Sequence, residues 1–201
     1  EWRAGRHQRS VLMNARSLSK VNMNRQRGVS LLEALITIVI LAFGILGLAG
    51  LEAKLQTVEV ESYARSQALV LLDDMAARLS AHRGVAATYV DTSPVGTGDT
   101  QPVDCSGTAL GVARDVCEWS NALKGNTELK GSSAIGAMIG GRGCIEQLAG
   151  VDPPSYRVTV AWQGLSPTVV PAIDCAQSLY GANDALRRTV AKVVSVASLG
   201  P

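Results

Sequence analysis

Histidine, aromatic residues and charge are all scarce in this chain of 201 residues. Its two histidines, His7 and His82, exclude a zinc site built on several histidines, and a histidine-dependent hydrolase would have to use His82. Ser80 lies beside His82, which is insufficient for catalysis. No G-x-S-x-G sequence and no paired-carboxylate motif occurs. The residues therefore predict no catalytic site, no metal and no cofactor.

The positive charge is concentrated at the amino terminus. Residues 1–28 hold seven Arg or Lys and one acid, Glu1, a net charge of +6. Because the whole chain carries +2, residues 29–201 carry −4. The basic character belongs to a short leader, which argues against nucleic-acid binding by the body.

The sequence begins with Glu1, and Met13 and Met23 are both possible translation starts. A start at Met23 would leave a six-residue basic leader ending at Gly28. We expect residues 1–22 to be either mis-called upstream sequence or a long leader, and assign them no fold.

The run Val29–Leu51 contains 23 residues and a single charge, Glu33. As a helix it would reach about 34 Å, enough to cross a hydrocarbon core of about 30 Å. It is too long for the apolar region of a secretory signal and matches the A-x-A cleavage pattern poorly. The basic leader and the acidic body predict a transmembrane helix with a cytoplasmic amino terminus and the body outside.

Glu33 allows two interpretations, because a carboxylate at the centre of a membrane helix costs about 2.5–3.5 kcal/mol, and less near an end. In the first, its side chain reaches the lipid headgroups. In the second, a cation approaches it within the membrane. Cleavage after Gly28 would place a new amine on Val29, one turn from Glu33, and two neighbouring subunits would then pair amine with carboxylate.

The residues around this cleavage position form a specific motif. Basic residues and Gly28 precede Val29-Ser30-Leu31-Leu32-Glu33 and the apolar run. This resembles the class III signal of type IV pilins and pseudopilins, in which Val29 is a mild departure from the commoner Phe or Met. The resemblance implies cleavage between Gly28 and Val29 by prepilin peptidase, N-methylation of Val29, and Glu33 as the assembly carboxylate.

Residues 52–82 contain neither Pro nor Gly, which predicts one helix from about Leu31 to Ala81, about 75 Å long. Its apolar positions form two patches. We expect the second to face the globular domain, and it comprises Leu69, Leu72, Met75, Ala76 and Leu79. We expect the first to face neighbouring subunits, and it comprises Leu48, Leu51, Leu55 and Val58. The alternative is an amphipathic helix wholly covered by its own domain.

The rest of the chain predicts a small sheet. Arg83-Gly84 ends the helix, and residues 84–104 read as a loop whose aspartates lack EF-hand spacing. Strands are predicted over Tyr156–Trp162, with alternate residues covering the helix, and over Thr189–Ala197. Trp162 is expected in the core. One long helix under a small antiparallel sheet is an α+β fold.

Four cysteines follow the apolar run: Cys105, Cys117, Cys144 and Cys175. An even number in a domain outside the cytoplasm predicts two disulfides, for which three pairings exist. We favour Cys105–Cys117, which closes a short loop, and Cys144–Cys175, which ties the region before the strand to the loop after it. We expect no metal site at these cysteines, because the sequence has no C-x-x-C pair and no histidine near them.

Further residues narrow the resemblance. Cys117-Glu118-Trp119, the run Tyr156–Gly164, Cys175 and a basic-then-apolar last strand are similar to PilV-type minor pilins. The resemblance implies a low-abundance subunit that helps prime a type IV pilus. Its partners would be other major and minor pilins, prepilin peptidase, the inner-membrane assembly platform and the lipid bilayer, with no nucleic acid.

This resemblance implies a cleaved leader (1–28), a transmembrane helix (29–51), its amphipathic continuation (52–82) and a disulfide-containing domain (83–201). The protein would reside in the bacterial inner membrane with its domain in the periplasm, and then in a cell-surface pilus. Two alternatives stay open. One is a minor pseudopilin of a type II secretion system, and the other is a signal-anchored periplasmic enzyme or binding protein with a pocket in residues 84–143.

Overall fold

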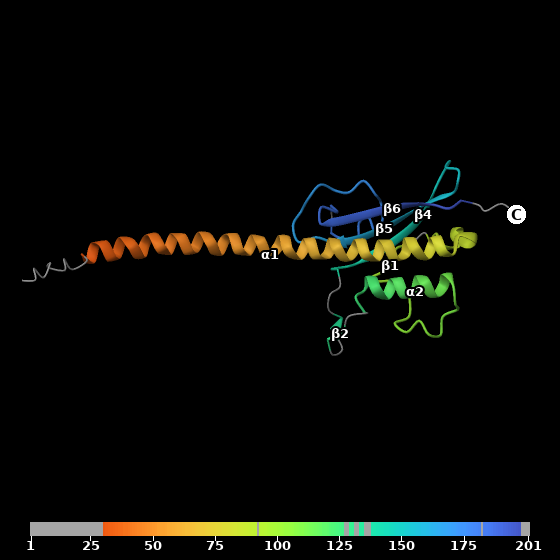
Figure 1. Cartoon of the computed structure of the whole chain (residues 1–201), viewed down its shortest axis with the longest axis horizontal. Coiled ribbons are helices and arrows are strands. Elements are labelled where there is room, and N and C mark those ends of the chain that lie inside the picture. The colour runs from red at the N-terminus through yellow and green to blue at the C-terminus, as the bar shows by residue number, and fades with distance from the viewer. Residues whose placement is uncertain are drawn as a thin grey trace, which may run out of the picture. The chain divides into compact units, whose positions relative to one another are not determined.

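The computed structural model describes residues 30–91, 93–126, 129–130, 133–134, 138–181 and 183–197. The elements in order are α1 (Leu31–Ala81), the 3-10 helix η1 (Arg83–Tyr89), β1 (Val95–Gly96), α2 (Val112–Leu123), β2 (Leu129–Lys130), β3 (Ser133–Ala134), β4 (Arg142–Leu148), β5 (Ser155–Gln163) and β6 (Arg187–Ser195) (Figure 1). The chain divides into two compact units, Glu1–Gly47 and Leu48–Pro201.

The predicted long helix is confirmed as α1. Ser30 caps its start, because the Ser30 Oγ accepts the Leu32 N–H at 3.3 Å and the Ser30 carbonyl accepts the Ala34 N–H at 3.1 Å. The segment after it is only partly the predicted loop, since η1 and β1 lie within residues 83–96.

The sheet has the strand order β1-β4-β5-β6, and every pair is antiparallel. β5 is central: Val158 lies opposite Ile145 on β4 and Lys192 on β6. Both predicted strands are confirmed. β5 extends one residue further at each end, and β6 begins and ends two residues before the predicted bounds. A separate hairpin pairs β2 with β3.

The core of the Leu48–Pro201 unit lies between the carboxy-terminal half of α1 and the sheet. The buried side chains of α1 are Ala68, Leu72, Met75, Ala76 and Leu79. All of these except Ala76 belong to one core cluster with Tyr156, Val158, Val160 and Trp162 of β5, the predicted face. Leu69 was predicted in this core but is 45% exposed, because the buried stripe passes through Ala68, about 100° around the helix. The α+β pilin-like architecture is thus confirmed.

Helix α2 packs against both α1 and the sheet through Trp119. The Trp119 Nε1 donates to the Leu71 carbonyl of α1 at 2.9 Å, and the ring is buried. The same ring lies against Gly143 of β4, where an added Cβ would be 2.1 Å from Cη2 of Trp119. A side chain at position 143 would therefore collide with the residue that joins three elements.

Replacing Gly143 with alanine should lower the free energy of unfolding by about 1–3 kcal/mol, because the new methyl group overfills this core. Chemical denaturation of the full chain in detergent micelles, followed by tryptophan fluorescence, measures the change. Gly107→Ala is the matched control, since its Cβ would meet no atom within 4 Å. Equal stability of the two variants would show that Trp119 does not depend on Gly143.

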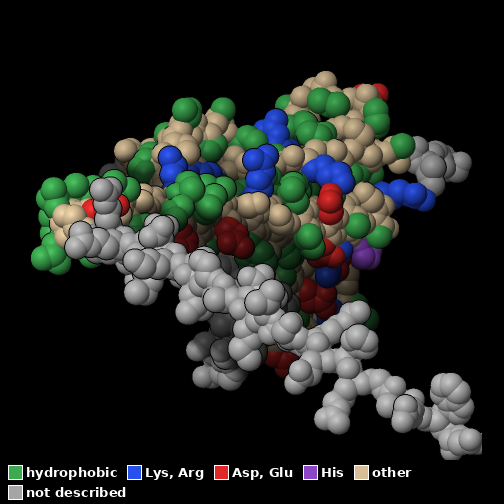
Figure 2. Space-filling view, turned by 60° about the vertical axis from the view of Figure 1, so that its left-hand side comes forward, with side chains coloured by type: hydrophobic (Ala, Val, Ile, Leu, Met, Phe, Trp, Pro, Cys, Tyr) green, Lys and Arg blue, Asp and Glu red, His purple; other side chains and the backbone are tan. Residues whose placement is uncertain are grey.

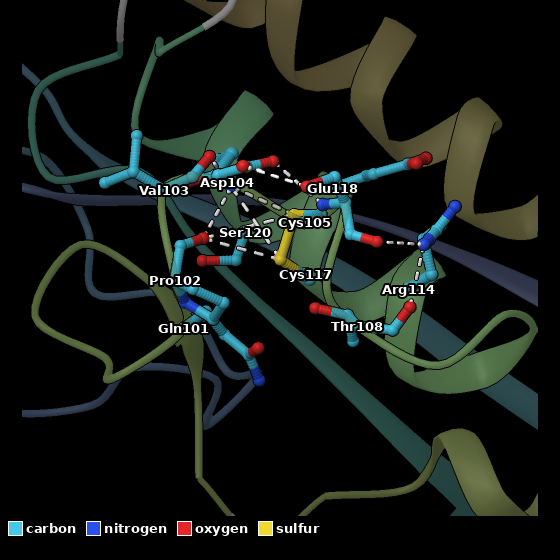
Figure 3. Close-up of a disulfide and its surroundings, with 12 residues drawn as sticks. Gln101, Pro102, Val103, Asp104, Cys105, Thr108, Arg114, Cys117, Glu118 and Ser120 are labelled. Atoms are coloured by element: carbon cyan, nitrogen blue, oxygen red, sulfur yellow. Dashed lines mark hydrogen bonds between the residues drawn. A yellow bond between two sulfur atoms is a disulfide. The ribbon is translucent and has the colours of Figure 1, made fainter.

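Two disulfides hold the remaining segments, and they join the pairs favoured from the sequence, Cys105–Cys117 and Cys144–Cys175. The first closes the loop before α2 (Figure 3). Arg114 of α2 also holds this loop by donating to the carbonyls of Ser106 at 2.7 Å and Thr108 at 2.8 Å. A disulfide of this kind typically contributes about 2–4 kcal/mol to the free energy of unfolding.

Asp99 anchors the beginning of the same loop. Burial opposes ionisation of its carboxyl group, but an ion pair with Lys124 and hydrogen bonds from the Gly96 N–H and Ser120 hydroxyl outweigh this and lower the pKa of Asp99. Asp99 is therefore a structural carboxylate. Asp91 and Asp104 accept hydrogen bonds from Ser93 and Ser106, two residues further on.

Candidate assembly site on the amino-terminal helix

The first turn of α1 contains the charged residue of the sequence motif. Glu33 is exposed and lies three residues after the capping Ser30. Ser-x-x-Glu at these positions is the capping-box pattern, and the positive end of the helix dipole favours a carboxylate there. Sequence reasoning missed this signal. Gly28 and Val29, the predicted processing residues, lie outside the described residues.

The helix that follows Glu33 is apolar on every side. α1 contains one window long and apolar enough to cross a membrane, with a mean hydropathy of 2.6 and none of its residues buried. The space-filling view shows hydrophobic side chains covering the exposed start of this helix (Figure 2). Water is an unfavourable environment for so much apolar surface, which fits membrane anchoring.

The predicted first apolar patch is exposed within the Leu48–Pro201 unit. Its members Leu48, Leu51, Leu55 and Val58 are all exposed, so the alternative of a helix wholly covered by its own domain is wrong. Val60 and Tyr63 extend the exposed apolar surface along α1. An exposed apolar surface of this kind is suited to contacts with other chains or with lipid.

Leu55→Ala and Leu72→Ala compare the stability cost of truncating a surface residue and a core residue of the same helix. Leu72 is 3% exposed, so Leu72→Ala should cost about 2–5 kcal/mol of stability. Leu55 is 58% exposed, so Leu55→Ala should change stability by no more than about 0.5 kcal/mol. Denaturation of the two full-length variants in the same micelles measures both values, and a large loss for Leu55→Ala would place that residue in the folded core.

A polar cluster joins the end of α1 to α2 and η1. Arg78 pairs with Asp74 at 3.0 Å, Asp115 at 2.9 Å and Glu118 at 2.7 Å. Burial opposes the charge of Arg78, but the three carboxylates together raise its pKa. These contacts tie α2 to α1.

The single histidine of the body belongs to this cluster. His82 Nδ1 lies 2.9 Å from the Tyr89 hydroxyl and 3.1 Å from Asp115 Oδ2. Burial, with the hydrogen bond to Asp115, raises the pKa of Tyr89, so this phenol is neutral at ordinary pH. Ser80 donates to the Ala76 carbonyl at 2.7 Å, so its hydroxyl hydrogen is directed to its own helix. The described residues hold no group of three or more His, Cys, Asp or Glu placed to bind a metal ion.

The residues that carried the narrower resemblance are core residues. Cys117 forms a disulfide, while Trp119, Tyr156 and Trp162 are buried between α1, α2 and the sheet. Their pattern therefore reports how the domain is packed. They belong to the Leu48–Pro201 unit, whereas Glu33 belongs to the Glu1–Gly47 unit.

Comparison with known families matches the prokaryotic N-terminal methylation motif to residues 23–49. No curated protein and no solved structure gives a significant match. The match covers Gly28 and Val29, which the sequence predicts as the processing residues, the carboxylate Glu33 and most of the apolar run. This motif characterises structural subunits, and with the α+β fold it supports a type IV pilin-like protein, either a pilin or a pseudopilin, that is processed by prepilin peptidase and assembles with other pilins.

Proposed function

We propose that this protein is a minor pilin, a low-abundance subunit that enters a type IV pilus and helps to prime its assembly. The observation that carries the proposal is the methylation motif over residues 23–49, with Glu33 exposed at the start of an unburied apolar helix. In this account the domain lies in the periplasm before assembly, and Cys105–Cys117 and Cys144–Cys175 stabilise it there.

Assembly begins when prepilin peptidase cleaves between Gly28 and Val29 and methylates the new amine. The amine of one subunit pairs with Glu33 of its neighbour, which offsets the cost of placing either charge in the membrane. Leu51, Leu55 and Val58 extend the contact beyond the membrane segment. The inner-membrane platform then moves the subunit from the lipid bilayer into the filament.

The minor rather than the major class is supported by the resemblance of Cys117-Glu118-Trp119 and of β5 to PilV-type subunits. The tight packing of Trp119 and Trp162 accounts for why these positions hold large aromatic residues. The proposed segments are a leader (1–28), a transmembrane helix (29–51), its amphipathic continuation (52–82) and the disulfide-bonded domain (83–201).

Quantitative mass spectrometry of sheared pili tests the minor-pilin assignment. We expect the mature chain at a small fraction of the major pilin, and fewer pili when its gene is deleted, with protein secretion unchanged. The opposite result, normal pili with failed secretion of folded proteins, would assign the chain to a type II secretion system as a minor pseudopilin. Normal pili and normal secretion would contradict both assignments.

A further inference from the structure

Strand β6 forms one edge of the sheet and has no partner on its outer side among the described residues. It runs for nine residues without proline and in unbroken register with β5. Exposed edges of this length usually carry a proline, a bulge or an outward-directed lysine that prevents pairing with another strand. The one lysine of β6, Lys192, is instead turned toward α1, where its Nζ lies 2.8 Å from Asp73 Oδ1.

The backbone of β6 has free hydrogen-bonding groups on that outer side. In an antiparallel ladder, alternate residues of a strand bond to the partner strand. The Gly164 N–H donates to the Leu186 carbonyl and the Val196 N–H donates to the Pro154 carbonyl, which shows which residues of β6 those are. Even-numbered residues of β6 therefore bond β5. Thr189, Ala191, Val193 and Ser195 direct their N–H and C=O groups outward, and those groups have no hydrogen bond within the described part of the chain.

The outer side of β6 also borders a groove. The groove has a volume of ≈ 380 Å³ and lies between α1, which contributes Val58, Ser62 and Arg65, and the sheet, which contributes Trp162, Thr189 and Val190. In a strand added beside β6, successive side chains would point to opposite faces of the sheet. Every second side chain would therefore point toward α1 and approach the groove. The apolar walls formed by Val58 and Val190 suit an aliphatic side chain.

The charge at the groove is positive. Glu61 is already occupied, because its Oε1 accepts the Leu165 N–H at 2.9 Å and lies 3.4 Å from the Arg188 guanidinium. Arg65 is exposed and forms no ion pair within the described residues. Its guanidinium is thus available to a carboxylate brought in by the added strand.

We propose that the outer edge of β6 is a docking site for an extended segment of another polypeptide. The segment adds a strand to the sheet, places an aliphatic side chain between Val58 and Val190, and directs an acidic side chain to Arg65. The edge and the groove exist whatever filament the chain enters, and Val58 is the one residue that the groove shares with the apolar patch expected to face neighbouring subunits.

A second copy of this chain fits the edge less well. Two β6 strands paired antiparallel would run the two α1 segments that pack on these sheets in opposite directions. The cations of β6 are already paired with Asp184, Glu61 and Asp73, whereas Arg65 at the groove has no ion pair within the described residues. The partner is therefore a different polypeptide with acidic residues.

Synthetic peptides of alternating Val and Thr, matched in length to β6, test the site on the full chain in detergent micelles. The first carries one central Glu, the second carries Lys in its place, and the third has methylated central backbone nitrogens. We expect the Glu peptide to bind with a Kd about tenfold lower than that of the Lys peptide. The methylated peptide should not bind, because it cannot donate the strand hydrogen bonds.

Two variants locate the binding. Ala191→Pro removes an outward N–H that makes no bond to β5, so it should abolish binding with the melting temperature preserved, whereas Ala191→Thr should bind as the wild type does. Arg65→Glu should reverse the preference between the Glu and Lys peptides.

Equal binding of those two peptides by the wild type, undiminished binding by Ala191→Pro, or no binding up to about 1 mM would overturn the proposal. A wild-type dimer that Ala191→Pro dissociates would make a second copy the occupant instead.

Discussion

Replacing Arg187 with alanine is expected to lower the free energy of unfolding by about 3–5 kcal/mol, because the residue holds a buried network together. Arg187 is 1% exposed. Its guanidinium donates to the carbonyls of Cys175 and Pro171, each at 3.1 Å, and to that of Ile173, and its Nε lies 3.4 Å from Asp184. The truncation would leave these carbonyls without their donor, and the buried Asp184 carboxylate without its counter-charge, with only the Ser178 N–H, among the described residues, still bonded to it.

The matched control is Arg157→Ala. Arg157 lies on β5 and forms one ion pair, with the exposed Glu146, so its loss should cost no more than about 1 kcal/mol. Denaturation of the full chain in micelles gives both values. If Arg187→Ala unfolds within 1 kcal/mol of the wild type by the same measurement, the segment around Cys175 is held by its disulfide alone.

The second large effect is expected at Glu33. In the proposed assembly step its carboxylate pairs with the amine of a neighbouring subunit, so Glu33→Gln should reduce the amount of this chain in filaments by about tenfold or more, equivalent to at least 1.4 kcal/mol. Processing should be unchanged, since Gly28 and Val29 are retained. Immunoblotting of sheared pili against the membrane fraction measures the distribution.

Ser30→Ala distinguishes this role from a local one. It removes the helix cap, worth about 0.5–2 kcal/mol, and leaves the charge of Glu33 in place. We expect Ser30→Ala to enter filaments nearly as the wild type does. If Glu33→Gln enters filaments normally, Glu33 only reaches the lipid headgroups; if both variants fail equally, the capping box at the helix start is what matters.

The long helix and the two main strands could be predicted because their signals are local. Residues 52–82 contain no Pro or Gly to break a helix, which favours one continuous helix, and the alternation along Tyr156–Trp162 defines a buried strand face. Leu69 was misassigned because it lies at the border of the buried face, about 20° around the helix from the buried Ala76, and only the shape of the opposing sheet determines where that face ends.

Helix α2 and strand β4 were not predicted because their starting signals are weak. α2 follows Gly111, whose φ is 93°, and no side chain caps it. A signal was nevertheless present, since Val112, Val116, Trp119 and Leu123 are spaced to form one apolar helix face. β4 starts in a glycine-rich segment, and Gly143 is required there by Trp119, a contact across 24 residues that no local pattern reveals.

The candidate site was predictable only in part. The motif from Gly28 to Glu33 is visible in the sequence because the proposed peptidase would read a linear segment. The proposed roles of Glu33 and of the exposed patch that includes Leu51, Leu55 and Val58 require a second chain, whose position is not encoded in this sequence. The β6 edge required the strand order and the register of the β5–β6 ladder.

Intact-mass measurement of the membrane-extracted protein, from strains with and without prepilin peptidase, distinguishes a processed pilin-like subunit from an unprocessed one. We expect a peptidase-dependent chain that starts at N-methylated Val29 and is lighter by four hydrogens for its two disulfides. A chain that keeps Arg27 and Gly28 in both strains would contradict this expectation, and would make the protein an ordinary membrane-anchored domain.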